Sequence, residues 1–163
     1  MKGKAKAADK TNVMRLLETA EIAFRTIKYE VDENDLSGVH VAEQLGQPVE
    51  QVFKTLVVQG EKQGYLVCCI PVAEELDLKK VAKAAGDKKV EMLPMKELLG
   101  VTGYIRGGCS PIGMKKKIPT FIDETAVLFE EIAVSAGIRG AQVLLNPETL
   151  GEYVQAEFVD LVK

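Results

Sequence analysis

The sequence is poor in the residues that build most hydrolytic and metal-dependent sites. Its 163 residues include one histidine and three cysteines. The lone His40 follows a turn at the start of a predicted helix, where a histidine is more often a surface or capping residue than a catalytic one. An odd number of cysteines, with Cys68 and Cys69 adjacent, is neither a disulfide framework nor a zinc-binding spacing. The usual general-base imidazole is therefore missing, and we expect no metal and no cofactor.

Long hydrophobic runs and nucleotide-binding motifs are also missing. No apolar stretch approaches the roughly 20 residues that span a bilayer, and no apolar segment of a secretory signal follows the basic start of the chain. No P-loop, zinc-protease motif or dinucleotide glycine spacing occurs. We therefore expect a cytoplasmic protein without a membrane partner. Residues 1–10 are predicted to form a flexible basic tail and residues 11–163 a single domain.

The overall composition is that of a folded globular protein. Hydrophobic residues make up 47% and charged residues 28% of the chain, and its net charge is −3. This balance argues against disorder and against a uniformly positive surface that would coat a nucleic acid. Local lysine clusters still leave room for an RNA partner bound through a patch. These clusters lie in residues 79–83, 88–89 and 115–117.

Hairpins and short helices alternate along the chain without repeating one β–α unit. Apolar residues recur at helical spacing after Asn12, a plausible cap, and Gly46 and Gly86 are predicted to end two further helices. Two β-rich runs, 52–59 and 65–72, predict a hairpin. The sequence therefore predicts an α+β fold with a curved, mixed or antiparallel, barrel-like β-sheet flanked by short helices. Further strands are expected at residues 24–31, 89–92, 119–122, 126–129, 132–134 and 156–161, and further helices after Pro94 and Asn146.

Lys54 is a single charge inside the apolar run from Val52 to Val58. Side chains alternate between the two faces of a strand, so Lys54 shares a face with Leu56 while Thr55 takes the other. A buried ammonium is costly unless an anionic group meets it, which makes Lys54 a candidate functional residue. The alternative is an edge lysine whose ammonium reaches water along its alkyl stem.

Two glycine-containing segments supply further candidates. Gly107 and Gly108 would let backbone amides approach a ligand and bind an anion or a carbonyl group. The alternative is a plain loop, which glycine content alone favours. Cys109 beside them lacks a histidine or other group that would activate its thiol. Ser135, where a strand end runs into a glycine turn, either orients a ligand or only caps the turn.

Six short motifs, taken in order, resemble the YbaK/EbsC family of free-standing prolyl-tRNA editing proteins. Each motif alone is weak, and it is their order and spacing that carries the resemblance. The similarity extends from the first predicted helix to the last strand and leaves out only the basic tail. The motifs are VFKTL (52–56), LDLKKVA (76–82), KKVEM (88–92), TGY (102–104), GGxSPxG (107–113) and SxGxRG (135–140).

The resemblance implies a mixed, barrel-like sheet flanked by helices and an enzyme that edits aminoacyl-tRNA. In the branch to which the chain is most similar, the substrate is cysteine wrongly attached to tRNA(Pro). The lysine matched by Lys54 is the essential polar residue of that family. Some relatives carry an acidic residue where this chain has Gln142, so no carboxylate role carries over to that position. The positions that match substrate-binding residues of the family are Tyr29, Thr55, Gly107, Gly108 and Ser135.

An aminoacyl ester is already activated, so an enzyme need mainly orient it and stabilise the charge that develops on its oxygen. The resemblance implies that the cysteine thiol attacks its own ester and leaves as a cyclic thiolactone, with Lys54 as an orienting, charge-stabilising donor. Two alternatives stay open, a deacylase for alanine or serine on tRNA and a non-catalytic aminoacyl-tRNA-binding module. Because a net charge of −3 does not suit tight tRNA binding alone, recruitment to prolyl-tRNA synthetase or another synthetase is expected.

Overall fold

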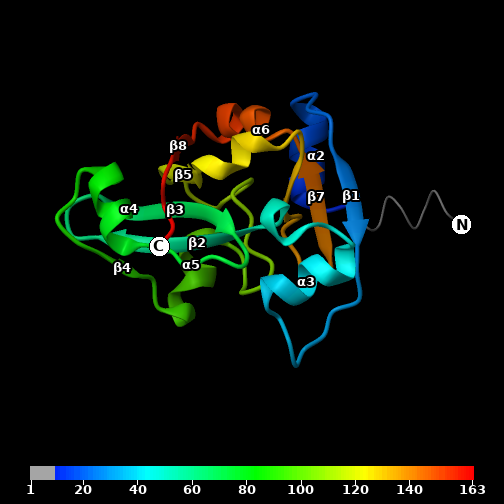
Figure 1. Ribbon diagram of the computed structural model, residues 1–163, viewed down its shortest axis with the longest axis horizontal. Helices are drawn as coiled ribbons and strands as arrows, with labels where there is room; N and C mark the ends of the chain where they lie inside the picture. Colours follow the sequence, from blue (N-terminus) through cyan, green and yellow to red (C-terminus); the bar gives the residue numbers. More distant parts are fainter. Residues whose placement is uncertain (1–9) are drawn as a thin grey trace, which may run out of the picture.

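The computed structural model describes residues 10–163 and shows two β-sheets surrounded by short helices (Figure 1). The predicted basic tail lies outside the described residues, except for Lys10. The helices are α2 (Asn12–Thr19), α3 (Gly38–Leu45), α4 (Leu78–Ala85), α5 (Leu98–Thr102) and α6 (Pro147–Val154), with 3-10 helices η1 (Val49–Gln51), η2 (Met95–Glu97) and η3 (Glu124–Leu128). The strands are β1 (Arg25–Lys28), β2 (Phe53–Gly60), β3 (Gly64–Pro71), β4 (Val90–Met92), β5 (Thr120–Asp123), β6 (Ile132–Ser135), β7 (Ala141–Leu145) and β8 (Glu157–Val159).

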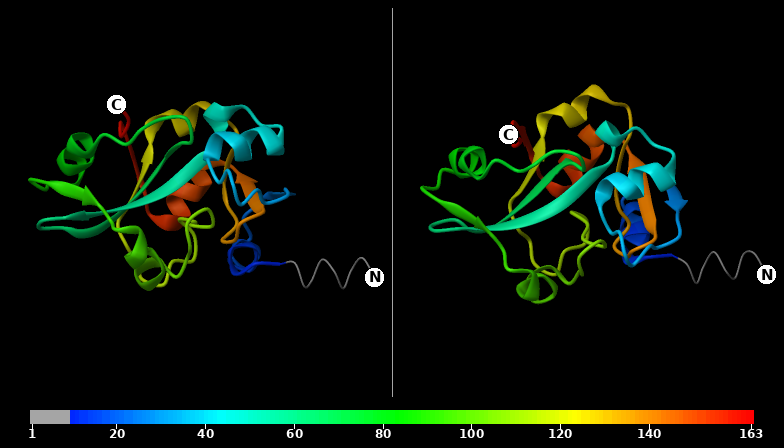
Figure 2. Two further views of the ribbon diagram at one scale, coloured as in Figure 1. Left: turned by 90° about the horizontal axis from the view of Figure 1, so that it is seen from below. Right: turned by 60° about the horizontal axis from the view of Figure 1, so that its bottom comes forward.

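The strands form a three-stranded antiparallel sheet, β1–β7–β6, and a five-stranded mixed sheet, β4–β2–β3–β5–β8. The predicted hairpin is β2–β3, whereas β5 runs parallel to both β3 and β8. An isolated parallel bridge between Val52 and Ala133 links the two sheets. The smaller sheet therefore stands at the end of the hairpin where β2 begins (Figure 2). This arrangement confirms the α+β class and the curved, mixed sheets, although the described strands do not close into a barrel.

The helices begin and end at the predicted capping residues and glycines, except that the cap of α2 is one residue earlier than predicted. Asp77 caps α4 by accepting hydrogen bonds from the next turn. Gly46 and Gly86 end α3 and α4 with positive φ angles of 68° and 72°, a conformation that glycine adopts without strain. The cap of α2 is Thr11, whose side chain accepts the Met14 amide, and Asn12 is the first helical residue. No helix within residues 10–163 is long and apolar enough to cross a membrane.

Two segments differ from the prediction. Most of residues 126–129, predicted as a strand, belong to the 3-10 helix η3, because the Asp123 side chain accepts the Thr125 amide and turns the chain. The strand β7 was not predicted at all. Its five residues are all buried, so its sequence lacks the alternation that identifies a half-exposed strand. β7 is nevertheless the central strand of the smaller sheet and carries Gln142.

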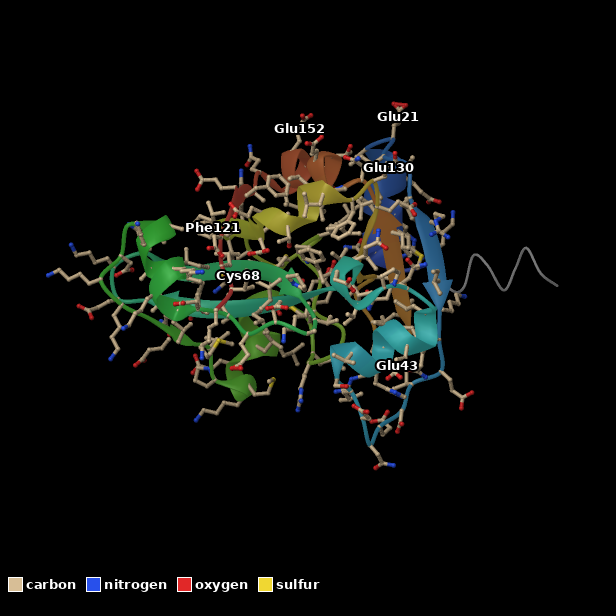
Figure 3. The ribbon with its side chains drawn as sticks, in the orientation of Figure 1. Glu21, Glu43, Cys68, Phe121, Glu130 and Glu152 are labelled. Atoms are coloured by element: carbon tan, nitrogen blue, oxygen red, sulfur yellow. The ribbon has the colours of Figure 1, made fainter. Side chains whose placement is uncertain are left out.

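The β2–β3 hairpin separates two hydrophobic cores. Phe53 and Val57 pack into the larger core, whereas Val58 packs into a second core beneath α4, which confirms the predicted alternation along β2. Cys69 and Cys68 likewise enter the first and the second core, and Figure 3 shows Cys68 near Phe121, its partner on β5. Burial raises the pKa of both thiols to about 12. Both are protonated core residues, as their adjacent positions on a strand predicted.

Candidate active site

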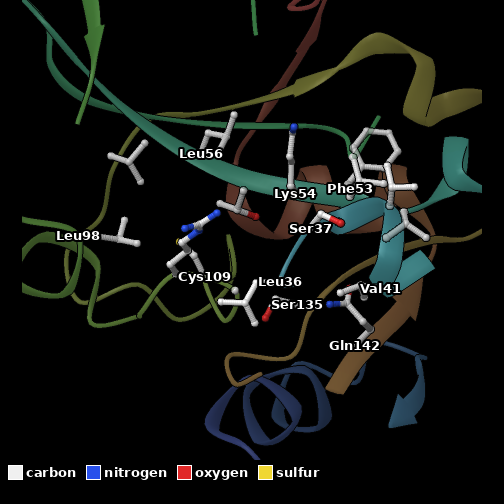
Figure 4. A pocket seen from close by; sticks show the side chains of 18 of the residues that line it. Leu36, Ser37, Val41, Phe53, Lys54, Leu56, Leu98, Cys109, Ser135 and Gln142 are labelled. Carbon is white, nitrogen blue, oxygen red and sulfur yellow. The ribbon is translucent and has the colours of Figure 1, made fainter. Parts of the chain in front are cut away.

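A pocket of about 450 Å³ opens beside β2 where the two sheets meet (Figure 4). Its walls come from β2, the start of α3, the segment from β4 to α5, the glycine loop and the strands β6 and β7. His40 is not among the lining residues. Five of the six predicted site residues, far apart in the sequence, meet in this one pocket. They are Tyr29, Lys54, Thr55, Gly107 and Ser135.

The first half of β2 has one unpaired edge, and this edge faces the pocket. β3 pairs along the whole strand, whereas β4 pairs only with the last three residues of β2. The Val52 carbonyl accepts the Val72 amide on the β3 side. The Val57 carbonyl accepts the Leu93 amide on the opposite side. Because hydrogen-bonding direction alternates along an antiparallel strand, the amide and carbonyl of Thr55 lie on the open edge, available to a ligand.

Lys54 lies at the pocket wall, half-buried and without a partner in the described part of the chain. Its ammonium makes no hydrogen bond, and no carboxylate in residues 10–163 lies within 4.0 Å. Burial lowers the pKa of Lys54 more than the attraction of Glu75 and Glu74 raises it. Figure 4 shows Lys54 and Leu56 leaving β2 on the same side, with the ammonium directed away from Ser135. Lys54 is thus a cation available to an incoming anionic group.

Thr55 and Cys109 place a hydroxyl and a thiol at the pocket. The Thr55 hydroxyl lies 3.7 Å from the Cys69 sulfur, within hydrogen-bond range for sulfur. Cys109 lines the pocket itself. Burial raises the pKa of Cys109 to about 12, although a hydrogen bond with Thr102 opposes the shift. A nucleophilic cysteine needs a thiolate, so Cys109 is not poised for attack at neutral pH.

The glycine loop is built for packing as well as for the pocket. The Gly108 amide donates to the carbonyl three residues earlier at 2.9 Å, which removes it from the donors available to a ligand, and Gly108 does not line the pocket. A methyl group on Gly108 would come within 3.2 Å of the Ile138 backbone. Glycine therefore lets this loop pack against the turn that follows Ser135. Of the pair, only Gly107 lines the pocket, and the Lys54 ammonium points away from this loop (Figure 4).

A family model for the aminoacyl-tRNA editing domain matches residues 36–153. The chain belongs to this family. It is 48% identical over 158 residues to EbsC of Enterococcus faecalis, which is named as a candidate Cys-tRNA(Pro)/Cys-tRNA(Cys) deacylase; the match covers 97% of this chain and 96% of EbsC. It is also 25% identical over 145 residues to a proline–tRNA ligase of Thermosipho africanus, covering 89% of this chain but 25% of the ligase.

A solved structure supports the same relationship. A candidate trans-editing enzyme for prolyl-tRNA synthetase superimposes on this editing domain with a TM-score of 0.81 at 25% sequence identity. The match covers 93% of this chain and 94% of the solved one. The pocket described above therefore belongs to an editing domain whose fold matches that of a solved trans-editing protein and whose sequence is similar to part of a synthetase.

Three polar residues that line this pocket were not predicted as site residues, and one of them, Ser37, caps α3 by accepting the His40 amide. Arg106, which lines the pocket, directly precedes Gly107 and Gly108 in the sequence. No sequence pattern identified this arginine as functional. Gln142 also lines the pocket and is 6% exposed. Its signal was present, since Gln142 is the single polar residue in an otherwise apolar run from Ala141 to Leu145. The same reasoning identified Lys54, but it could not be applied here because β7 itself was missed.

Proposed function

We propose that this chain is a trans-editing deacylase that removes cysteine from mischarged tRNA(Pro). The observation that carries the proposal is the 48% identity with EbsC over almost the full length of both proteins. The pocket supports it, because about 450 Å³ is in the range of small-molecule sites and suits a small amino acid with its ribose. The substrate is an ester between the carboxyl group of cysteine and the terminal ribose of the tRNA.

The chemistry of the pocket supports cleavage in which the substrate provides the nucleophile. The lining residues include no histidine, aspartate or glutamate, and Cys109 keeps its proton because its pKa is raised to about 12. In the proposed step the cysteine sulfur bonds to its own carbonyl carbon, and the bond from that carbon to the ribose oxygen breaks. The thiol proton ends on the ribose oxygen. The products are a cyclic thiolactone and a tRNA with a free terminal hydroxyl, and an intramolecular attack of this kind has a high effective molarity.

We assign Lys54 to the ribose and phosphate end of the substrate. Its ammonium is directed away from the part of the pocket that holds Ser135, and no carboxylate of the described residues lies within 4.0 Å of it. A phosphate oxygen would supply the missing anionic partner in a charge-assisted hydrogen bond. The open-edge amide of Thr55 is a further donor for the ester or the ribose. Tyr29, Gly107 and Ser135 complete the proposed substrate contacts.

A deacylation time course with a panel of charged tRNAs tests the proposal. We expect Cys-tRNA(Pro) to lose its amino acid quickly and Pro-tRNA(Pro) to stay as long-lived as in a control without protein. Faster cleavage of alanyl- or seryl-tRNA would reassign the substrate. If none of the charged tRNAs is cleaved, the deacylase proposal fails, and a non-catalytic aminoacyl-tRNA-binding module replaces it.

We further propose that the protein acts in the cytoplasm beside prolyl-tRNA synthetase. The relationship to a segment of a proline–tRNA ligase supports this partner, because that segment is part of the synthetase chain. A net charge of −3 also argues against tight tRNA binding without help. Co-sedimentation of this protein with prolyl-tRNA synthetase, with and without tRNA(Pro), tests the association. Sedimentation as separate species under both conditions would contradict it.

A further inference from the structure

Three lysine clusters in the sequence have no role in the proposed function, and the structure distinguishes them. They lie in residues 79–83, 88–89 and 115–117. In the first, Lys80 forms an ion pair with Asp160 at 2.8 Å. In the second, Lys89 forms one with Glu91 at 3.4 Å, and Asp87, whose hydrogen bonds with backbone amides lower its pKa, directly precedes the cluster. Nearby carboxylates therefore offset part of the positive charge of both clusters.

The third cluster belongs to residues 103–117, which we call the basic loop. The cations of this loop are Arg106, Lys115, Lys116 and Lys117. All four are exposed, and no carboxylate within residues 10–163 lies within 4.0 Å of their charged atoms. The sequence has no acidic residue from position 98 to position 122. Arg139, which donates to the Arg106 carbonyl, is itself paired with Glu33. Within the described residues, no ion pair offsets the four charges of the basic loop.

The basic loop is tied to the pocket through the short helix α5 (Figure 2). The first residue of α5, Leu98, lines the pocket. The Thr102 hydroxyl donates to the Leu98 carbonyl at 2.8 Å, and the Lys115 amide donates to the Thr102 carbonyl at 2.9 Å. The Lys116 ammonium lies 5.8 Å from the ring centre of Tyr65 on β3. Because α5 rises only about 6 Å along its axis, the lysines begin close to the mouth of the pocket.

The pocket and the basic loop together suit a nucleotide strand that continues beyond the pocket. A volume of about 450 Å³ holds the aminoacylated end of the proposed substrate, and the adjoining nucleotides leave through the mouth with a phosphate each. Exposed cations without a carboxylate partner are the groups that phosphates bind. The rest of the surface does not compete for them, because the chain has a net charge of −3 even with the four cations of the basic loop included.

We propose that the basic loop binds the phosphates of the unpaired 3′ end of the tRNA where this strand leaves the pocket. The inference rests on the proposed function, since it takes the aminoacyl ester as the occupant of the pocket. Arg106, which lines the pocket, makes the first contact, and residues 115–117 contact phosphates further from the ester. Contacts with phosphates fix the position of a strand without reading its sequence, which suits a 3′ end that all tRNAs share.

Fluorescence anisotropy with uncharged tRNA(Pro), labelled at its 5′ end, tests the proposal without a chemical step. The charge-removing variant is Lys115→Gln/Lys116→Gln/Lys117→Gln. The matched control, Lys79→Gln/Lys83→Gln/Lys88→Gln, changes the net charge equally at three exposed lysines of the other two clusters. A further variant carries Lys→Arg substitutions at positions 115–117 and retains the charge. Each protein is titrated with intact tRNA(Pro) and with tRNA(Pro) that lacks the unpaired 3′ end, at salt concentrations from about 50 to 200 mM.

We expect the affinity of the wild-type protein for intact tRNA(Pro) to fall steeply as the salt concentration rises. Each phosphate contact with a single strand contributes about 0.7 to the slope of log affinity against log salt concentration. The charge-removing variant should therefore bind more weakly, with a slope smaller by about 2. The matched control and the Lys→Arg variant should retain the wild-type affinity and slope. With the trimmed tRNA, all four proteins should bind alike.

Three results would overturn the proposal. Equal losses in the two Lys→Gln variants would show an effect of net charge alone. A loss that persists with the trimmed tRNA would mean that the basic loop contacts the duplex instead of the 3′ end. The third such result is no measurable binding of intact tRNA(Pro) by the wild-type protein at the lowest salt concentration. The expected pattern in a protein that cleaves none of the charged tRNAs would reject the deacylase function but support the phosphate contacts of the basic loop.

Discussion

Replacing Lys54 by methionine separates the function of this side chain from its contribution to folding. The substitution breaks no hydrogen bond or ion pair within residues 10–163. Burial lowers the pKa of Lys54, so the folded state carries a penalty for the charge at neutral pH, which decreases as the pH rises from the lowered pKa towards the 10.5 of free lysine. At pH 7 the free energy of unfolding should therefore stay within about 1 kcal/mol of the wild-type value, with any change towards higher stability.

The loss of activity should be much larger. A hydrogen bond to a charged group contributes about 1.5–3 kcal/mol, which corresponds to a decrease in kcat/KM of roughly 10- to 150-fold. Single-turnover deacylation of Cys-tRNA(Pro) at several protein concentrations separates binding from the maximal rate. Because Lys54 is assigned to the ribose and phosphate end, we expect the loss mainly in binding. For the same reason, wild-type affinity should fall as the pH rises through a pKa below 10.5.

Lys62→Met is the matched control, since Lys62 is an exposed lysine in the turn of the same hairpin. It should retain wild-type binding, maximal rate and stability. A Lys54→Met protein with normal binding and a reduced maximal rate would refute the assignment of Lys54 to the ribose and phosphate end. Lys54 would then act on the ester carbonyl. A decrease of several kcal/mol in the free energy of unfolding would instead identify Lys54 as a structural residue.

Other residues and the substrate itself provide further tests. S-methylcysteinyl-tRNA(Pro), which cannot cyclise, should be as stable with the protein as without it; undiminished cleavage would eliminate thiol assistance. Cys109→Ala should stay active, and alkylation of Cys109 should need a higher pH than free cysteine because its pKa is about 12; an inactive, folded variant would identify Cys109 as functional. Asp77→Ala removes the α4 cap and should lower the free energy of unfolding by about 1 kcal/mol in urea titrations, with activity unchanged. Gly108→Ala adds a methyl 3.2 Å from the Ile138 backbone and should destabilise the protein by about 1–3 kcal/mol, measured the same way; unchanged stability would mean that the loop has room.

The sequence predicted those parts of the fold that local chemistry determines. The hairpin, the α4 cap at Asp77 and the glycine ends of α3 and α4 each rest on residues within one turn or one strand pair. The strand β7 and the helix η3 depend on distant contacts. β7 is fully buried between β1 and β6, and η3 follows Asp123, which also accepts the Leu161 amide from the far end of the chain. These distant contacts, of β7 with β1 and β6 and of Asp123 with Leu161, cannot be identified from residues that are neighbours in the sequence.

The same distinction between local chemistry and distant contacts explains which features of the site were predicted. Lys54 was found because one charge interrupts an apolar strand, and the structure brings it into one pocket with Tyr29, Thr55, Gly107 and Ser135. The motifs did not show that Gly108 uses its amide within its own loop. Nor did they show the direction of the Lys54 ammonium, which depends on how β2 is oriented relative to β6 and β7. Side-chain direction is a consequence of tertiary structure, so a motif identifies the residue but not the group that it faces.

The polar groups of the pocket lie where the folded chain leaves its own hydrogen bonding incomplete. The open edge at Thr55 exists because β4 pairs only with the last three residues of β2, and β6 bridges only to Val52, directly before β2. The side-chain oxygen of Gln142 is buried and has no hydrogen-bond partner within residues 10–163. Under the proposed function, the ester or the ribose of the substrate would accept a hydrogen bond from the open-edge amide of Thr55. A site of this kind orients its substrate without a general base, which is sufficient where the substrate carries its own nucleophile.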